Sequence, residues 1–203
     1  MNKKIIFSFI LFGWMQHNCC SLPVAVLETE RLFLRPVDIH EDLEAIAKLA
    51  LNPLVIKLTG FFPVMQDLQE VENYMINYLI GDQERGILPG YHAIWAVVHK
   101  TTRQVIGLIG FFAYNPMHQR AEFGYVINPD YWNCGYAVEG SRAIIDYAFA
   151  QGLIRIYATI DPENIASERV AQKLQMSFEG LLRSYLIVRG ECKDRKLYAI
   201  IKQ

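Results

Sequence analysis

Hydrophobic and polar residues change their spacing several times along the chain, and each change marks a predicted element. The segment ETERLFLRPV alternates leucines with polar neighbours, which predicts a strand that ends at Pro36. Helical spacing follows twice. Asp38 is placed to cap a first helix that runs to Ala50, and apolar residues recur at helical spacing over residues 67–80.

The second half of the pattern is dominated by apolar runs with short connections. HAIWAVVHK, VIGLIGFFAY and RAEFGYVIN predict an antiparallel meander of three strands. A helix is predicted from Tyr136 to Gln151, and IRIYATI then predicts a buried strand at 154–160. Asp161 with Pro162 has the signature of a cap and first turn, which predicts another helix. LLRSYLIVRG and KDRKLYAII predict a terminal hairpin around Gly190.

The predicted order of elements is therefore strand, two helices, three strands, helix, strand, helix and two strands, or βααβββαβαββ. This order indicates an α/β protein with a mixed, mostly antiparallel twisted sheet that contains one strand–helix–strand crossover and is flanked by helices. No repeat, low-complexity tract or linker interrupts the chain after residue 27, so we expect one domain over residues 27–203.

Composition limits the classes of partner. The 203 residues are 52% hydrophobic, and 20 Lys and Arg stand against 21 Asp and Glu. This balance gives no global basic field, so we expect no nucleic-acid partner. The four cysteines match neither a zinc ligand set nor a disulfide framework, and the five histidines lack ligand spacing. We therefore expect free thiols and no metal site.

The first 26 residues have a composition of their own. MNKK followed by the apolar run Ile5–Met15 resembles the charged and hydrophobic regions of a secretory signal, and the run is too short for a membrane span of ~20 residues. Either residues 1–26 are such a signal, or the native start is Met15. We expect a cytoplasmic protein without a stable membrane span, with export as the alternative if the segment acts as a signal.

The stretch YWNCGYAVEG at residues 131–140 precedes the predicted helix from Tyr136. The first four N–H groups of a helix lack internal partners and carry partial positive charge, so they attract anions. Gly135 and Ala137 leave room for phosphate oxygens to reach these amides. The alternative is a purely structural helix start. Neither a G-x-x-x-x-G-K-[ST] loop nor a G-x-G-x-x-G fingerprint is present, which weighs against a nucleotidase or a nicotinamide enzyme.

Several segments together are similar to one family. In order along residues 28–201 they are ETERLFLRP, WAVVHK with VIGLIGF, AEFGYVINPDYW, GYAVEGSRAIIDYAF, DPENIASERVAQKL and EGLLRSYLIVRGECKDRKLYAI. They resemble the GNAT acyltransferase superfamily, and within it the Rim-type branch that acetylates ribosomal-protein N-termini. The resemblance implies the GNAT fold and acetyl-CoA as the co-substrate.

The resemblance also implies which residues bind the donor. Backbone groups along the strand that contains Val126 and Ile127 would contact the pantetheine arm, and Asn164 would hydrogen-bond the same arm or the acetyl group. The alternative for Asn164 is an ordinary helix cap. The pyrophosphate would lie on the backbone amides of a loop and helix start, which consists of Asn133, Cys134, Gly135, Tyr136, Ala137 and Val138.

Two residues are candidates for catalysis. Glu122 lies in AEFGY, where the resemblance implies a base that deprotonates the amine directly or through water, and partial burial between Ala121 and Phe123 predicts a raised pKa. The alternative is a strand residue that faces solvent or pairs with a cation such as Arg120. Ser167 would lie near the sulfur of the donor and help to protonate it, or else would simply cap a helix.

The chain departs from the branch at three positions. Asn133 and Cys134 replace the usual residues after the tryptophan of the loop, and Gln175 stands where the branch has glycine at a helix end. Asn tolerates a left-handed backbone best among non-glycine residues, so the shape of the loop is expected to survive. Cys134 adds no positive or amide group, and these departures predict weaker binding and slower turnover.

The sequence thus predicts an N-acetyltransferase that acts in a ternary complex as a monomer or homodimer. The acceptor would be a primary amine, either the N-terminus of a ribosomal or other protein or the amine of a small molecule. The alternative is a non-catalytic acyl-CoA-binding or sensor protein on the same fold. Acceptor specificity is expected from the two early helices, the loop at 58–64 and the terminal hairpin; Phe61 and Phe62 form either an apolar wall or part of the core.

Overall fold

One eight-stranded sheet forms the centre of the molecule in the computed structural model, which describes residues 22–58, 62–80, 93–188 and 190–203. The strand order is β1-β2-β3-β4-β5-β6-β8-β7, and every pairing is antiparallel except β5 with β6. The strands are β1 (Leu27–Glu28), β2 (Leu32–Pro36), β3 (Ala93–His99), β4 (Val105–Asn115), β5 (Arg120–Ile127), β6 (Arg155–Ile160), β7 (Ser177–Val188) and β8 (Glu191–Ile201). The predicted mixed, mostly antiparallel sheet is confirmed.

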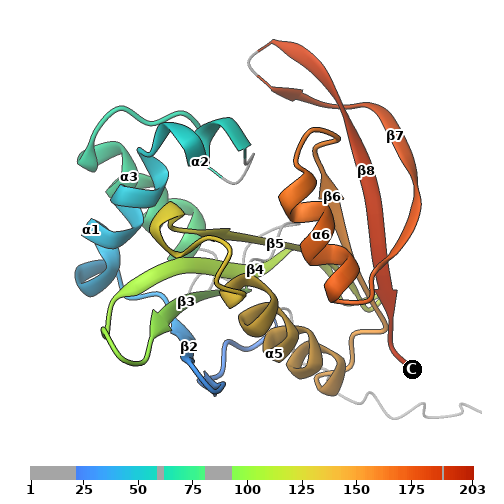
Figure 1. Ribbon diagram of the computed structural model, residues 1–203, viewed down its shortest axis with the longest axis horizontal. Coiled ribbons are helices and arrows are strands. Elements are labelled where there is room, and N and C mark those ends of the chain that lie inside the picture. Colours follow the sequence, from blue (N-terminus) through green and yellow to red (C-terminus); the bar gives the residue numbers. More distant parts are fainter. Residues whose placement is uncertain (1–21, 59–61, 81–92, 189) are drawn as a thin grey trace, which may run out of the picture.

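Helices cover both faces of this sheet (Figure 1). They are α1 (Ile39–Ala50), α2 (Pro53–Leu58), α3 (Leu68–Tyr74), α5 (Tyr136–Ala150) and α6 (Ile165–Lys173), with a π-helical segment at Met75–Ile80 and a 3-10 turn at Pro129–Tyr131. The side chains of α1 and α3 pack with Ile94, Ala96 and Leu108 on one face. Those of α5 and α6 pack with Trp95 and Ile109 on the other, because neighbouring strand residues point to opposite faces.

Local signals explain most helix boundaries. The Asp38 carboxylate accepts hydrogen bonds from the amides of His40 and Glu41, so the predicted cap of α1 is confirmed. The prediction that the last helix starts at Asp161 is wrong. α6 begins at Ile165 because the side chain of Asn164 accepts the amide of Ser167 and acts as its cap. Sequence analysis also missed the short elements β1 and α2.

The sheet opens between β5 and β6. These parallel strands pair at Arg120↔Arg155, Ala121↔Ile156 and Glu122↔Tyr157 and no further in the described residues, although β5 continues to Ile127 and β6 to Ile160. Each strand stays paired with its antiparallel neighbour beyond that point. The separation therefore leaves a gap in the sheet whose inner end lies at Glu122.

The N-terminal signal-like segment falls almost entirely outside the described residues, which begin at residue 22. Among the described helices, none has the length and apolar character needed to cross a membrane.

Candidate active site

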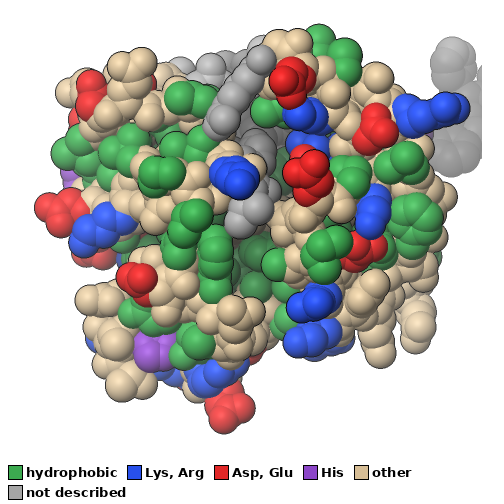
Figure 2. Space-filling model, turned by 45° about the horizontal axis from the view of Figure 1, so that its top comes forward, with side chains coloured by type: hydrophobic (Ala, Val, Ile, Leu, Met, Phe, Trp, Pro, Cys, Tyr) green, Lys and Arg blue, Asp and Glu red, His purple; other side chains and the backbone are tan. Residues whose placement is uncertain are grey.

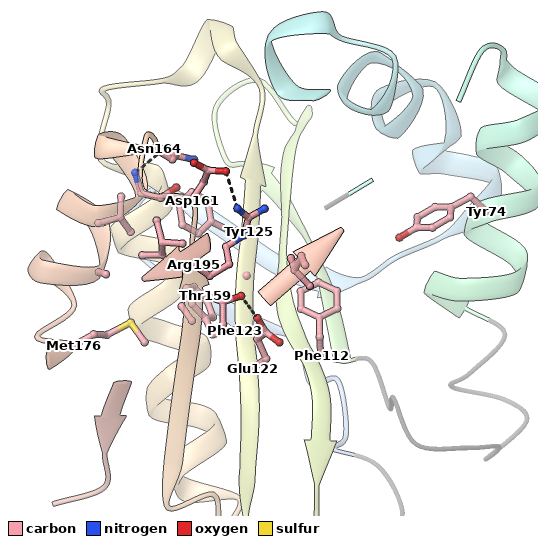
Figure 3. A pocket seen from close by; sticks show the side chains of 17 residues that line it. Tyr74, Phe112, Glu122, Phe123, Tyr125, Thr159, Asp161, Asn164, Met176 and Arg195 are labelled. Atoms are coloured by element: carbon pink, nitrogen blue, oxygen red, sulfur yellow. Dashed lines mark hydrogen bonds and ion pairs between the residues drawn. The ribbon is translucent and has the colours of Figure 1, made fainter. Parts of the chain in front are cut away.

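A cavity of about 370 Å³ occupies the gap between β5 and β6. Figure 2 shows the hollow in the middle of one face of the molecule, with hydrophobic side chains beside it and side chains of both charges around it. Strands β4, β5, β6 and β8 and helices α3 and α6 all contribute to its wall (Figure 3). The side chains that carry polar or charged groups are Tyr74, Glu122, Tyr125, Thr159, Asp161, Asn164, Ser167 and Arg195.

Glu122 lies at the inner end of the cavity, half-buried on β5. Its Oε1 accepts a hydrogen bond of 2.5 Å from the hydroxyl of Thr159 on β6. Burial raises the pKa of Glu122 above its ordinary value, while hydrogen bonding from Thr159 and the nearby charge of Arg195 act in the opposite direction. No ion pair with Arg120 is found among the described residues. A carboxylate with a raised pKa in a cavity has the properties of a general base.

Ser167 and Asn164 come together at the start of α6. The Asn164 side chain caps the helix through the Ser167 amide at 3.0 Å, which orients both residues toward the cavity that they line. The hydroxyl of Tyr125 donates to Ser167 Oγ at 3.2 Å. Burial raises the pKa of Tyr125, so this hydroxyl keeps its proton and remains a donor. Asn164 therefore acts as the helix cap that was its structural alternative, and its place in the cavity wall leaves it able to contact a ligand as well.

The loop before α5 has the shape expected of an anion cradle. Asn133 has φ +60° and Gly135 has φ +84°, so both adopt the left-handed backbone that the sequence analysis anticipated for Asn133. Gly135 is the N-cap of α5, and no side chain in the described part of the chain caps the free amides of the helix. Because these amides lie at the positive end of a 15-residue helix, they are available to bind an anion.

A clasp from the β1–β2 connection holds this cradle. The Arg31 guanidinium pairs with Glu139 in the first turn of α5 at 2.6 Å and donates to the Cys134 carbonyl at 3.0 Å. Glu139 also accepts the Thr29 hydroxyl at 2.6 Å and the Arg31 amide at 2.8 Å. Burial by itself would raise the pKa of Glu139, but these hydrogen bonds outweigh it and hold the pKa below the ordinary value. The Arg31 side chain also lies over the Tyr136 ring, 4.4 Å from its centroid.

Sequence analysis missed this clasp. ETERLFLRP and GYAVEG are 108 residues apart at the Arg31–Glu139 contact, and nothing in either segment indicates that they touch. It also missed the ion pair between Arg195 and Asp161 in the cavity, at 2.7 Å. For each contact, the sequence showed only that the two segments it joins both belong to the family resemblance.

Other predicted positions do not line the cavity with their side chains. Val126 and Ile127 are buried in the cores on opposite faces of the sheet, so only their backbone is available, and the Ile127 carbonyl already accepts the Trp132 indole N–H at 2.6 Å. Phe62 is part of the core, as one of the two alternatives for Phe61 and Phe62 had it. Phe61 lies outside the described residues.

Cys134 and Cys192 are free and exposed, whereas Cys19 and Cys20 precede the described part of the chain. Gln175 has φ +64°, which places a non-glycine residue in the left-handed conformation at the end of α6. The described residues contain no group of three or more His, Cys, Asp or Glu side chains arranged to hold a metal ion.

Comparison with known proteins gives consistent matches. The family model described as an acetyltransferase (GNAT) domain matches residues 31–177. The uncharacterized N-acetyltransferase YoaA of Bacillus subtilis (strain 168) is 34% identical over 178 residues, which are 87% of this chain and 97% of YoaA. A crystal structure of a GNAT-family acetyltransferase from Bacillus anthracis matches with a TM-score of 0.73 at 29% identity, covering 87% of this chain and 98% of that one.

The ribosomal L7/L12 alpha-N-protein acetyltransferase RimL, in complex with coenzyme A, matches with a TM-score of 0.75 over 87% of this chain and 98% of RimL. At 20% identity this likeness concerns the fold alone. The matches therefore support the predicted superfamily but do not single out the predicted Rim-type branch.

Proposed function

Because the chain belongs to the GNAT acetyltransferase family, we propose that it transfers an acetyl group from acetyl-CoA to a primary amine by direct attack within a ternary complex. The chain is an acetyltransferase by family; the donor site, the roles of the individual residues and the acceptor are the proposal. Since its donor is a cytosolic metabolite, we place the reaction in the cytoplasm. Membership of the Rim-type branch stays a prediction.

The observation that carries the proposal is the opening of the sheet between β5 and β6. It ends at a half-buried carboxylate, Glu122, and is flanked by the uncapped start of α5. Gly135 and Asn133 would hold the pyrophosphate through backbone amides of the cradle. Backbone groups of β5 toward Val126 and Ile127, together with Asn164, would bind the pantetheine arm, whose amides need partners along an extended path.

Acetyl-CoA supplies a thioester carbonyl to the site, and the residues of this chain manage the protons. Glu122 would accept a proton from the incoming amine, directly or through a water molecule, because only the neutral amine is a nucleophile. Ser167 would donate a proton to the departing sulfur. The hydroxyl of Tyr125, which donates to Ser167 Oγ and keeps its own proton, would leave the Ser167 proton free to point at the sulfur, and water that enters as the products leave would return a proton to Ser167.

The test is acetyl transfer from acetyl-CoA to a panel of amines, with products identified by mass spectrometry. The panel contains a peptide with a free N-terminus, a polyamine, an aminoglycoside and amino acids. We expect turnover of at least one acceptor and loss of most of this turnover in Glu122→Gln. When both substrates are varied, we expect intersecting lines in double-reciprocal plots of initial rate against substrate concentration. Parallel lines would contradict direct attack, because they indicate a covalent enzyme intermediate.

The same panel tests the alternative of an acyl-CoA-binding protein. A rise in melting temperature on adding CoA, without product from any amine, would favour that alternative. No specific feature of the described residues favours it, because both left-handed positions, Asn133 and Gln175, keep the backbone shape that glycine would give.

A further inference from the structure

A buried cation, Arg195, lines the cavity and has no part in the proton transfers described above. It lies on β8, is 6% exposed, and is drawn in Figure 3 with an ion pair to Asp161. A buried guanidinium destabilises the fold unless its N–H groups have hydrogen-bond partners, so each of its donors needs an acceptor.

Only one edge of the guanidinium has protein partners among the described residues. Nη1 donates to Asp161 Oδ2 at 2.7 Å and to the Asp194 carbonyl at 3.0 Å. In the described part of the chain, Ser141 Oγ is the one fully buried side-chain polar atom without a hydrogen-bond partner. Nε and Nη2 of Arg195 are therefore not fully buried. Arg195 lines the cavity, so a ligand bound there can reach donors that the described protein atoms leave unused. Nε and Nη2 lie side by side on the guanidinium, which is the arrangement that binds both oxygens of one carboxylate.

The chain holds this guanidinium in one place. The register of β7 against β8 shifts between Leu182 and Leu186, and Arg195 pairs with Leu182 at the edge of that irregularity. Asp194 fixes the bulge by accepting the Ser184 amide at 2.8 Å, while its own carbonyl accepts Arg195 Nη1. A bulge of this kind re-aims a neighbouring side chain and is common beside active sites.

Three charged side chains therefore face the same cavity: the Glu122 carboxylate, and the Arg195 guanidinium with its ion-pair partner Asp161. The charge of Arg195 acts to lower the pKa of Glu122, which burial raises. An amine bound beside Glu122 would lie within a cavity that also offers a carboxylate-binding edge.

We propose that Arg195 is a specificity-determining residue that binds a carboxylate carried by the acceptor, so that the enzyme favours amines of the amino-acid type over plain alkylamines and polyamines. This inference rests on the proposed function and names the substrate class of the same cavity. A polyamine offers only cations, which suit Glu122 but cannot accept a hydrogen bond from the remaining donors of Arg195. An amino acid presents both charges and satisfies both groups.

The experiment compares matched acceptors in the parent and in Arg195→Gln. One set is phenylalanine, phenylalaninamide and 2-phenylethylamine, and the second is alanine, alaninamide and ethylamine. For each acceptor, kcat/KM of the variant is divided by that of the parent, so that differences in intrinsic amine reactivity cancel. We expect kcat/KM to fall about 10- to 100-fold for the free amino acid and little for the simple amine, as for loss of charge-assisted hydrogen bonds.

Arg195→Gln leaves Asp161 without its partner, so the double variant Arg195→Gln, Asp161→Asn serves as a second test that removes the unpaired charge. The melting-temperature shift on adding CoA checks that each variant is folded. Equal losses for all three members of a set would overturn the proposal, and so would parent activity confined to amines without a carboxylate. An equal loss for the amide and the acid would mean that a carbonyl is bound and the carboxylate assignment is wrong. A parent that acetylates no amine at all would instead overturn the proposed function.

Discussion

Replacing Gly135 tests the anion cradle most directly. Gly135 has φ +84°, and a Cβ added there would lie 3.5 Å from Arg31 Nη2, which is an ordinary contact. Space is thus available, and the cost of Gly135→Ala comes from the left-handed backbone, about 1–2 kcal/mol. In a chain of this length that corresponds to a fall in melting temperature of roughly 2–8 °C.

A charged side chain at the same position should act on binding. In Gly135→Glu, a carboxylate at ~5 Å from a pyrophosphate with two negative charges costs about 2 kcal/mol at an effective dielectric constant of ~60. This corresponds to an increase in the Kd for CoA on the order of 30-fold. Gly135→Gln has nearly the same size and backbone strain without the charge, so the difference between the two variants isolates the electrostatic part.

The assay is isothermal titration with CoA, with Gly152→Ala as the matched control. Gly152 follows α5 at its other end, has φ +102°, and has open space around its Cβ position, so it should lose stability without losing affinity. The cradle assignment is refuted if Gly135→Glu binds CoA as tightly as Gly135→Gln does. Equal losses of affinity in Gly135→Ala and Gly152→Ala would also refute it, because they would indicate a global effect.

Three further predictions follow from hydrogen bonds near the cavity and the cradle. Arg31→Gln should raise the KM for acetyl-CoA about three- to tenfold with kcat unchanged. A double-mutant cycle with Glu139→Gln should give a coupling energy of only ~1 kcal/mol, because the Arg31 side chain is 41% exposed. Additive effects of the two substitutions would contradict the clasp. Thr159→Val removes a hydrogen bond that lowers the pKa of Glu122, so this pKa should rise further. The acid limb of the pH profile of kcat/KM should therefore move to higher pH. A profile with the same acid limb as the parent would count against Glu122 as the base. Ser167→Ala should lower kcat about 10- to 100-fold while the Kd for CoA changes little, and a variant with parental kcat would remove Ser167 as the proton donor.

Much of the fold could be predicted because its signals are local. Alternation in β2, helical spacing in α5 and the Asp38 cap each depend on residues a few positions apart. The boundary of α6 could not be placed in this way, since Asp161 and Asn164 are both good caps and the choice depended on surroundings. Asp161 accepts the Glu163 amide in a local turn and also binds Arg195, which lies 34 residues away on β8, while Asn164 caps the helix.

The sequence by itself determined the order of elements, the family resemblance and the position of a glycine-bearing helix start. It did so because backbone preferences and side-chain periodicity are properties of short segments. Only the tertiary structure decided that Arg31 clasps the cradle through Glu139, and that Glu122 and Arg195 face one cavity. The shared cavity arises from the separation of β5 from β6 and from the pairing of β8 beside β6, whereas the clasp arises from the packing of α5 against β1 and β2. Such long-range placement leaves no pattern within any one segment.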